Sequence, residues 1–342
     1  MTAKAENALA TAEQKGARRR SIRFALAACF AALALVAGAA PIRAIEDEAA
    51  ATMDRVFARV AFARKEIEGI RLEMGEPRSE PSGIAVTNAG TREVFFAVQN
   101  MFGKANRLSF EQAREMAPTP EAPVGEILPF DISVVVTATL MRLREVKAKL
   151  GISEPTTEPP TIGMKTPSEV FVSVIEANRQ LDLLLNQRVG PSDVFQKVTL
   201  AVGYAARLLA RFPGQSRIPE APPFEPKKFP ADVYRRLLSC FDSVRSVMKD
   251  SGFDTLELHS GEGGYGWVTT GDTYELASLI VAELSYLHSQ IPAARAPRNV
   301  YYPGRKVHAH VYQRAGVLEA QLHNLQRWVT RDRRWLTRAE TE

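Results

Sequence analysis

The sequence predicts an all-α protein in which a helix and a proline-rich connector form a unit that repeats along the chain. Three observations support this fold class. A helix-opening phrase of proline followed by an acidic residue recurs at intervals of 38–40 residues, with one interval of 24. Apolar residues spaced three and four apart, as in an α-helix, follow each phrase. None of the 21 prolines falls inside a predicted helix.

Residues 1–40 have the pattern of an export signal. A basic stretch at 15–23 precedes an apolar stretch at 24–40, and Ala37-Gly38-Ala39 offers a small-residue cleavage site. We therefore expect a cleaved signal peptide and a periplasmic protein, exported by either the Sec or the twin-arginine route. The alternative is an uncleaved inner-membrane anchor at 24–40, because seventeen apolar residues just reach across a bilayer.

The formal charge of +5 lies mostly in this leader. Residues 1–40 hold six Lys or Arg and two acidic residues, which leaves +1 on the remainder. A nucleic-acid partner is therefore not expected. Two cysteines exclude a disulfide scaffold and a four-cysteine zinc site. Cys240 is predicted to be a small buried hydrophobic residue.

A long amphipathic helix is predicted over residues 45–75. Its apolar residues alternate three and four positions apart, which is a heptad pattern, and charged residues occupy the other faces. This stripe either packs on the rest of the chain or forms a seam with a second chain. The heptad positions are Met53, Val56, Val60, Ala63, Ile67, Ile70 and Met74.

The repeated phrase predicts a helix start each time it occurs. Its clearest copies begin at Pro129, Pro167, Pro191 and Pro230. Proline suits the first helical position, and an acid two residues later caps free N–H groups at the positive end of the helix. We interpret this row of acids as helix caps rather than as metal or acid–base groups. The capping positions are Glu93, Asp131, Glu169, Asp193, Asp232, Asp272 and, in place of an acid, His310.

The units are predicted to form a first helical repeat pair over 84–150 and a main helical repeat domain over 160–342. An extended 15-residue connector spans about 50 Å and a 20-residue helix about 30 Å, so neighbouring helices can be parallel or antiparallel. The short connection at Gly190 predicts an antiparallel pair formed by 168–187 and 191–211. A closed bundle and an open solenoid both remain compatible with the pattern.

Aromatic residues and histidines gather toward the C-terminus. All eight tyrosines lie at or after Tyr204, and all three tryptophans and five histidines lie after residue 258. Loops at 259–267 and 301–310 precede helices and combine aromatic with basic residues, as binding surfaces do. The glycine-rich loop 259–267 lacks the preceding strand that a dinucleotide-binding fingerprint requires. The candidate binding residues are Tyr265, Trp267, Tyr301, Tyr302, Arg305, His308 and His310.

We predict no catalytic, metal or cofactor site. The sequence contains no GxSxG, HExxH, CxxCH or Walker motif. His308 and His310 would need His259 and further ligands to hold a metal, and such isolated histidines are usually structural. The basic, aromatic stretch 327–336 is interpreted as a helix end, with peripheral contact to a membrane surface as the alternative.

The first functional hypothesis is an exported, non-enzymatic helical repeat protein that binds or scaffolds a protein partner or a second copy of itself. The alternative is a periplasmic small-ligand sensor or carrier, with a pocket between helices lined by the four aromatic residues of the two loops. A third hypothesis is a hydrolase or lyase that uses His259, Glu262 and His308.

Overall fold

A computed structural model describes residues 52–337 except 124, 162, 215 and 261–263. The predicted leader, residues 1–40, lies outside the described residues. The described part holds eight helices and one two-stranded ribbon, so the all-α prediction is confirmed apart from that ribbon. None of these helices is long and apolar enough to cross a bilayer. The helices are α3 (Met53–Met74), α4 (Thr91–Ala113), α5 (Pro129–Leu150), α6 (Pro167–Leu184), α7 (Pro191–Leu209), α8 (Pro230–Asp250), α9 (Thr270–Ser289) and α10 (His308–Arg331).

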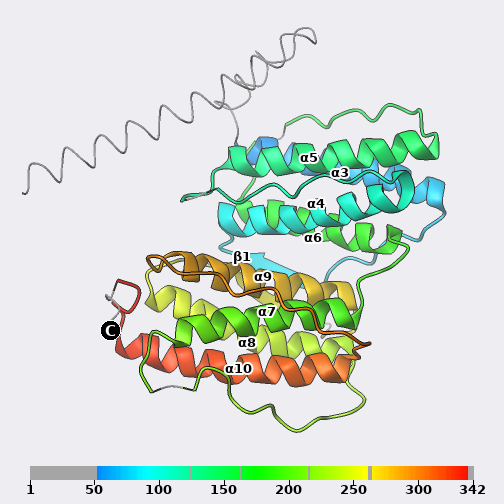
Figure 1. Cartoon of the computed structure of the whole chain (residues 1–342). Coiled ribbons are helices and arrows are strands. Elements are labelled where there is room, and N and C mark those ends of the chain that lie inside the picture. Colours follow the sequence, from blue (N-terminus) through cyan, green and yellow to red (C-terminus); the bar gives the residue numbers. More distant parts are fainter. Residues whose placement is uncertain (1–51, 124, 162, 215, 261–263, 338–342) are drawn as a thin grey trace, which may run out of the picture. The chain divides into compact units, whose positions relative to one another are not determined.

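The helices pack as two four-helix bundles, α3–α6 and α7–α10 (Figure 1). Within each bundle, each of the first two helices packs against both of the last two. The first two helices therefore lie at diagonally opposite corners of the bundle. The bundle alternative is therefore the one the structure adopts. The division between the bundles falls between Leu184 and Pro191, whereas the sequence analysis placed a boundary between residues 150 and 160.

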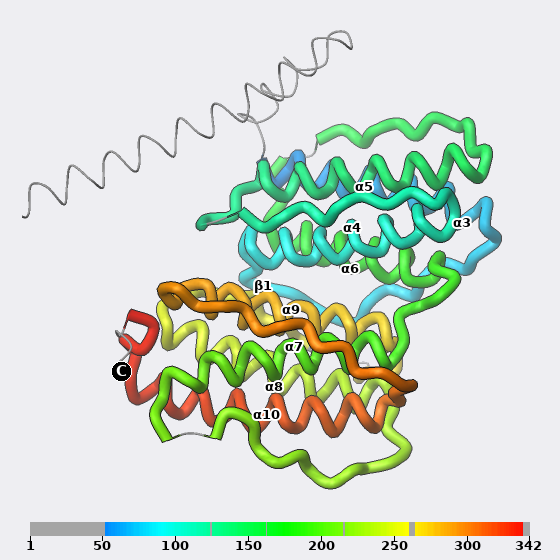
Figure 2. The backbone as a smooth tube through the Cα atoms, in the orientation of Figure 1, coloured from blue at the N-terminus to red at the C-terminus, as the bar shows by residue number. Residues whose placement is uncertain are grey.

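All four helices of a bundle run in the same direction. Ser109 donates to Glu145 at 2.8 Å, which joins the C-terminal ends of α4 and α5. Thr330 donates to Asp250 at 2.7 Å, which joins the C-terminal ends of α10 and α8. Figure 2 shows why: each long connector within a bundle returns along the bundle before the next helix begins. The proline-rich connectors are long because they must span a whole helix.

The predicted antiparallel pair of α6 and α7 is wrong. The chain does reverse direction at the short connection, but α6 and α7 belong to different bundles and do not pack side by side (Figure 1). Six residues cannot return along a 30 Å helix, so the next helix runs the opposite way. The short connection is therefore the crossing from one bundle to the other.

The capping prediction is confirmed at all seven positions. The backbone N–H of the residue before each helix donates to the side chain three residues later, at 2.7–3.2 Å. Parallel helices bring their positive ends together, which is unfavourable, and negative caps offset it. The pairs are Gly90–Glu93, Leu128–Asp131, Thr166–Glu169, Gly190–Asp193, Phe229–Asp232, Thr269–Asp272 and Val307–His310.

We expect the substitution Asp193→Ala to lower the free energy of unfolding by about 1 kcal/mol, because the Gly190 N–H and the positive end of α7 lose their acceptor. Asp193→Asn keeps an acceptor but not the charge, so it should cost less. Urea denaturation of the two variants measures this difference. Equal stability of D193A and the wild type would show that the cap does not stabilise α7.

The described part of the predicted first helix buries the predicted stripe. Helix α3 begins at Met53, where the extended Thr52 caps it and its hydroxyl accepts from the Arg55 N–H at 3.4 Å; the predicted residues 45–51 lie outside the described residues. The middle of the heptad stripe, from Val56 to Ile70, is buried in the core. The helix packs on α5 and α6 of its own chain.

A short antiparallel ribbon links connectors of the two bundles. Strand β1 (Ile84–Thr87) pairs with β2 (Glu257–Ser260), with Ile84 opposite Ser260. The sequence analysis predicted no strand, because four-residue segments inside connectors carry too little periodicity to identify. The ribbon fixes the path of both connectors beside α4 and α9, where the candidate site lies.

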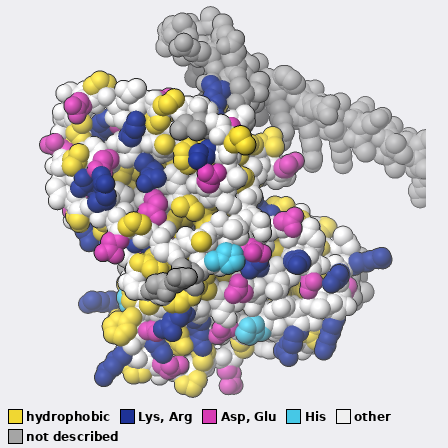
Figure 3. All heavy atoms as spheres, turned by 180° about the vertical axis from the view of Figure 1, so that it is seen from behind, with side chains coloured by type: hydrophobic (Ala, Val, Ile, Leu, Met, Phe, Trp, Pro, Cys, Tyr) yellow, Lys and Arg dark blue, Asp and Glu magenta, His cyan; other side chains and the backbone are white. Residues whose placement is uncertain are grey.

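The surface and the C-terminal end agree with the composition. Figure 3 shows Lys and Arg mixed with Asp and Glu over one face, as the small net charge outside the leader implies.

Trp335 is only 1% exposed and lies 5.6 Å from the Phe212 ring, so this aromatic side chain packs inside the protein's own fold. Cys240 is buried as predicted, and burial raises the pKa of its thiol.

Candidate functional site

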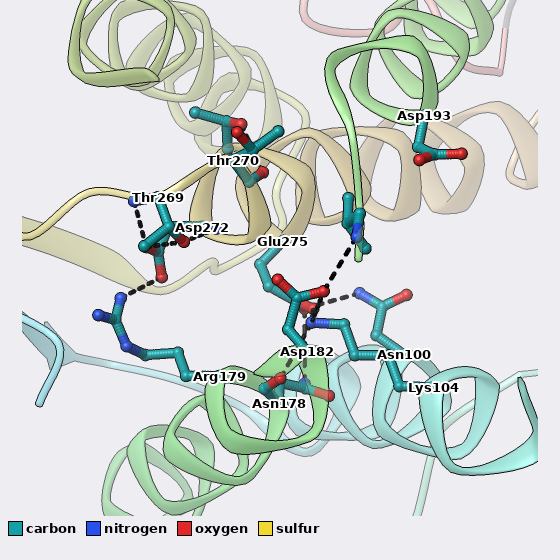
Figure 4. Close-up of polar contacts among 12 residues, drawn as sticks. Asn100, Lys104, Asn178, Arg179, Asp182, Asp193, Thr269, Thr270, Asp272 and Glu275 are labelled. Carbon is teal, nitrogen blue, oxygen red and sulfur yellow. Dashed lines mark hydrogen bonds and ion pairs between the residues drawn. The ribbon is translucent and has the colours of Figure 1, made fainter. Parts of the chain in front are cut away.

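A pocket of about 340 Å³ lies where α4, α6 and α9 meet beside the short α6–α7 connection. Helices α4 and α9 come from different bundles and pack against each other. Lys104 from α4, Asp182 from α6 and Glu275 from α9 converge on this pocket (Figure 4). The exposed side chains of Arg78 and Arg188 also line it. The pocket is therefore built by both bundles.

Lys104 is one of two buried cations that line the pocket. Its Nζ lies 2.9 Å from the Glu275 carboxylate and 3.9 Å from that of Asp182, and it donates to the Asn178 carbonyl at 3.1 Å. Burial lowers the pKa of Lys104, but the charges of Glu275 and Asp182 more than offset burial, so its pKa is raised. The Lys104 side chain is therefore a cation at neutral pH.

Arg179 forms the second buried ion pair. Its guanidinium binds the Asp272 carboxylate, and its Nε donates to the Glu80 carbonyl at 3.0 Å. Asp272 also accepts from the Thr269 N–H at 2.7 Å, which caps α9. The Arg179 guanidinium carbon lies 5.4 Å from the centre of the Trp267 ring. A helix cap of the second bundle thus also holds a cation of the first.

Asp182 lies against the first turn of α9. A Cβ atom on Gly271 would come within 2.5 Å of Asp182 Oδ2, so this close approach requires glycine. The other oxygen, Oδ1, accepts from the Val189 N–H at 3.4 Å. The Asp182 carboxylate therefore occupies the position beside the positive end of α9 where an anion is favoured.

An apolar space of about 40 Å³ adjoins the polar pocket, and Trp267 and Glu275 line both. Trp267 contacts Tyr234 edge to face, with ring centroids 5.6 Å apart. Its Nε1 donates to the Gly264 carbonyl at 2.9 Å. Trp267 is thus a fixed wall between a charged and an apolar compartment.

The structure separates the four aromatic residues that the sequence analysis assigned to one pocket. Trp267 lines the pocket. Tyr265 does not line it, and its ring centroid lies 5.9 Å from that of Tyr234. Tyr302 lies 5.8 Å from the Phe195 ring of α7, and Tyr301 is exposed. Neither Tyr301 nor Tyr302 lines the pocket. The aromatic pair of the second loop therefore forms no wall of this site.

The basic candidates of the second loop have different positions. Arg305 is exposed. His308 Nε2 lies 3.0 Å from the hydroxyl of Thr270, which lines the pocket. His310 accepts from the Val307 N–H at 3.2 Å and is the cap of α10. Of the three, only His308 reaches the edge of the pocket.

The residues of the hydrolase hypothesis contact different elements. His259 is exposed on β2, 3.6 Å from Glu257 and 3.3 Å from Thr87, whereas His308 contacts α9. Glu262 lies outside the described residues. Among the residues that the structure describes, no three His, Cys, Asp or Glu are arranged to hold a metal ion.

A second buried ionic cluster joins the start of α4 to the C-terminal half of α9. Arg92 Nη2 lies 2.9 Å from Glu93 and 3.1 Å from Glu283, and its guanidinium carbon lies 4.5 Å from the centre of the Tyr286 ring. Burial and the charge of Glu93 raise the pKa of Glu283 to about 8, although Arg92 opposes them. Contact between α4 and α9 is therefore polar at the start of α4 and again near its middle, at Asn100 and Lys104, with the apolar space between.

Sequence patterns do not predict the polar pocket, because most of its charged residues lie inside helices, away from the aromatic loops. One signal was present. Lys104 follows Met101 and precedes Leu108 at helical spacing, so a charged residue interrupts an apolar stripe. Asn178 does the same between Val174 and Leu181. Such interruptions indicate buried polar groups, but they do not reveal which ones meet.

No protein-family model, curated protein or solved structure matches this chain.

Proposed function

We propose that the pocket between the bundles binds a small molecule and that the protein is a ligand carrier or sensor. One observation supports this most strongly: five charged residues, each at most 8% exposed, lie at the pocket. Four of them line it, and the fifth, Asp272, lines the adjoining apolar space and binds Arg179. Apolar residues often replace buried ion pairs without loss of stability, so folding alone does not require them. Pockets with a few convergent polar groups and an aromatic wall are typical of ligand sites. The five are Lys104, Arg179, Asp182, Asp272 and Glu275.

Export to the periplasm is part of the same proposal and rests on the sequence of residues 1–40. The scaffold role, with a protein partner or a second copy of the chain, is a second proposal. It is supported by exposed apolar side chains on the connectors, where Tyr301 is 78% and Phe229 is 67% exposed. Pull-down from a periplasmic extract with Y301A and F229A variants tests it.

We also propose that the repeat is a duplication of a four-helix unit. The bundles have the same pattern of helix contacts, and corresponding helices start 138–141 residues apart. The unequal interval of 24 in the sequence pattern falls at the crossing between the bundles. The corresponding starts are Met53 and Pro191, Thr91 and Pro230, Pro129 and Thr270, and Pro167 and His308.

A thermal-shift screen of metabolites tests the ligand proposal. A ligand at 100 times its dissociation constant should stabilise the protein by about 2.7 kcal/mol and raise Tm by about 5 °C. Val189→Trp fills the pocket without removing a charge and should abolish the shift. Tyr301→Ala, outside the pocket, should preserve it. The proposal fails if no compound raises Tm, or if V189W responds as the wild type does.

A further inference from the structure

The five buried charged residues at the pocket do not balance in charge, and this imbalance restricts the chemical class of the ligand. Lys104 and Arg179 are the cations of the buried group, and Asp182, Asp272 and Glu275 are its anions, so one negative charge is in excess. An uncompensated charge in a poorly solvated site is costly. Neutralising that charge is a source of binding energy for a cation.

Asp182 is the carboxylate left without a close cation. Arg179 binds Asp272 directly, and Lys104 lies 2.9 Å from Glu275. The distance from Lys104 to Asp182 is 3.9 Å, beyond hydrogen-bond length. The only hydrogen bond recorded to Asp182 in the described residues comes from Val189, and its side chain is 12% exposed where it lines the pocket. Asp182 is therefore open to a ligand ammonium group.

A further cation nearby does not remove this imbalance. Lys197 of α7 interacts with Glu275 electrostatically, but its ammonium lies against the Tyr274 ring, 5.2 Å from the centroid, and it does not line the pocket. Burial lowers the pKa of Lys197, although the charge of Glu275 opposes this effect. Asp182 is thus not neutralised from the α7 side.

The outer part of the pocket carries two arginines and one acidic residue, Glu80, so its net charge is positive. Arg78 and Arg188 line it with side chains that are 74% and 53% exposed. Arg78 contacts the Glu68 carboxylate and Arg188 contacts the Glu76 carboxylate, each through one nitrogen. A guanidinium carries five N–H donors. Both arginines can therefore also bind a carboxylate of a ligand.

We infer that the pocket binds a small zwitterion of the free amino acid class, with its ammonium at Asp182 and its carboxylate at Arg78 and Arg188. This rests on the proposed function and names its ligand class. Leu183, Val189 and Trp267 provide an apolar wall between the charged groups, which suits an apolar side chain. A simple anion would meet the excess negative charge at Asp182, and a simple amine would leave the arginines unused.

Calorimetric titration with three matched probes tests this ligand class. Leucine carries both charges, 3-methylbutylamine lacks the carboxylate, and 4-methylpentanoate lacks the ammonium. The other free amino acids and inorganic phosphate complete the panel, because the side-chain preference is open. We expect at least one amino acid to bind at least tenfold more tightly than its amine analogue, and its deaminated analogue not to bind. Asp182→Asn should weaken amino acid binding at least tenfold, whereas Asp242→Asn, on the exposed face of α8, should not.

The possible failures are distinguishable. Binding of 4-methylpentanoate or phosphate without binding of any amino acid overturns the zwitterion inference and leaves the proposed function intact. A metabolite screen that finds only uncharged ligands also overturns the zwitterion inference and leaves the proposed function intact. No binding by any compound in either panel overturns both. If D182N lowers the Tm of the free protein, Arg78→Gln with Arg188→Gln replaces it, since these exposed side chains should lose the carboxylate contribution without unfolding the protein.

Discussion

Replacing Lys104 with methionine is expected to lower the free energy of unfolding by about 3–5 kcal/mol. Methionine fills a similar volume but leaves Glu275 buried without its cation and removes the positive charge 3.9 Å from Asp182. It also removes the donor to the Asn178 carbonyl, which ties α4 to α6. Urea denaturation followed by circular dichroism measures the loss.

Two further variants separate the stability lost with the ion pair from the stability lost with the lysine side chain itself. Lys149→Met changes an exposed lysine near the end of α5 and should alter stability by less than about 0.5 kcal/mol. Combining Lys104→Met with Glu275→Gln should recover part of the loss, because the unpaired carboxylate becomes neutral. If K104M costs no more than K149M, the pair contributes nothing to joining the helices.

Features of this protein that depend on neighbouring residues can be predicted from its sequence. Helix starts were predictable because the cap is local: Asp193 and the Gly190 N–H it accepts from are three residues apart. Burial of the stripe from Val56 to Ile70 followed from spacing alone. The parallel direction of the helices was not predictable, because connectors of this length permit both directions.

The candidate site depends on contacts across long stretches of sequence. Asn100 donates to Glu275 at 3.0 Å, and these residues are 175 positions apart. Asp272 was correctly predicted to be a cap, but its second role, binding Arg179, depends on how the bundles pack. Local patterns identify a capping acid equally well whether it faces solvent or a buried arginine, so they could not single out this one.

Glu283 should make the stability of the protein depend on pH. Its pKa rises from the ordinary value of 4.5 to about 8 on folding, because burial and the charge of Glu93 disfavour the ionised form. Between these two values the folded state keeps a proton that the unfolded state releases. Stability from this group is therefore complete below pH 4.5 and is lost as the pH rises toward 8.

The substitution Glu283→Gln removes this titration and keeps the shape of the side chain. We expect E283Q and the wild type to have similar stability near pH 5, and E283Q to be more stable by a few kcal/mol at pH 8.5. Guanidinium denaturation at intervals between the two pH values measures the difference, with the exposed Glu121→Gln as control. A constant difference across that range would mean that Glu283 is ionised throughout. In that case Arg92 would neutralise it fully despite Glu93, and the contact between α4 and α9 would be insensitive to pH.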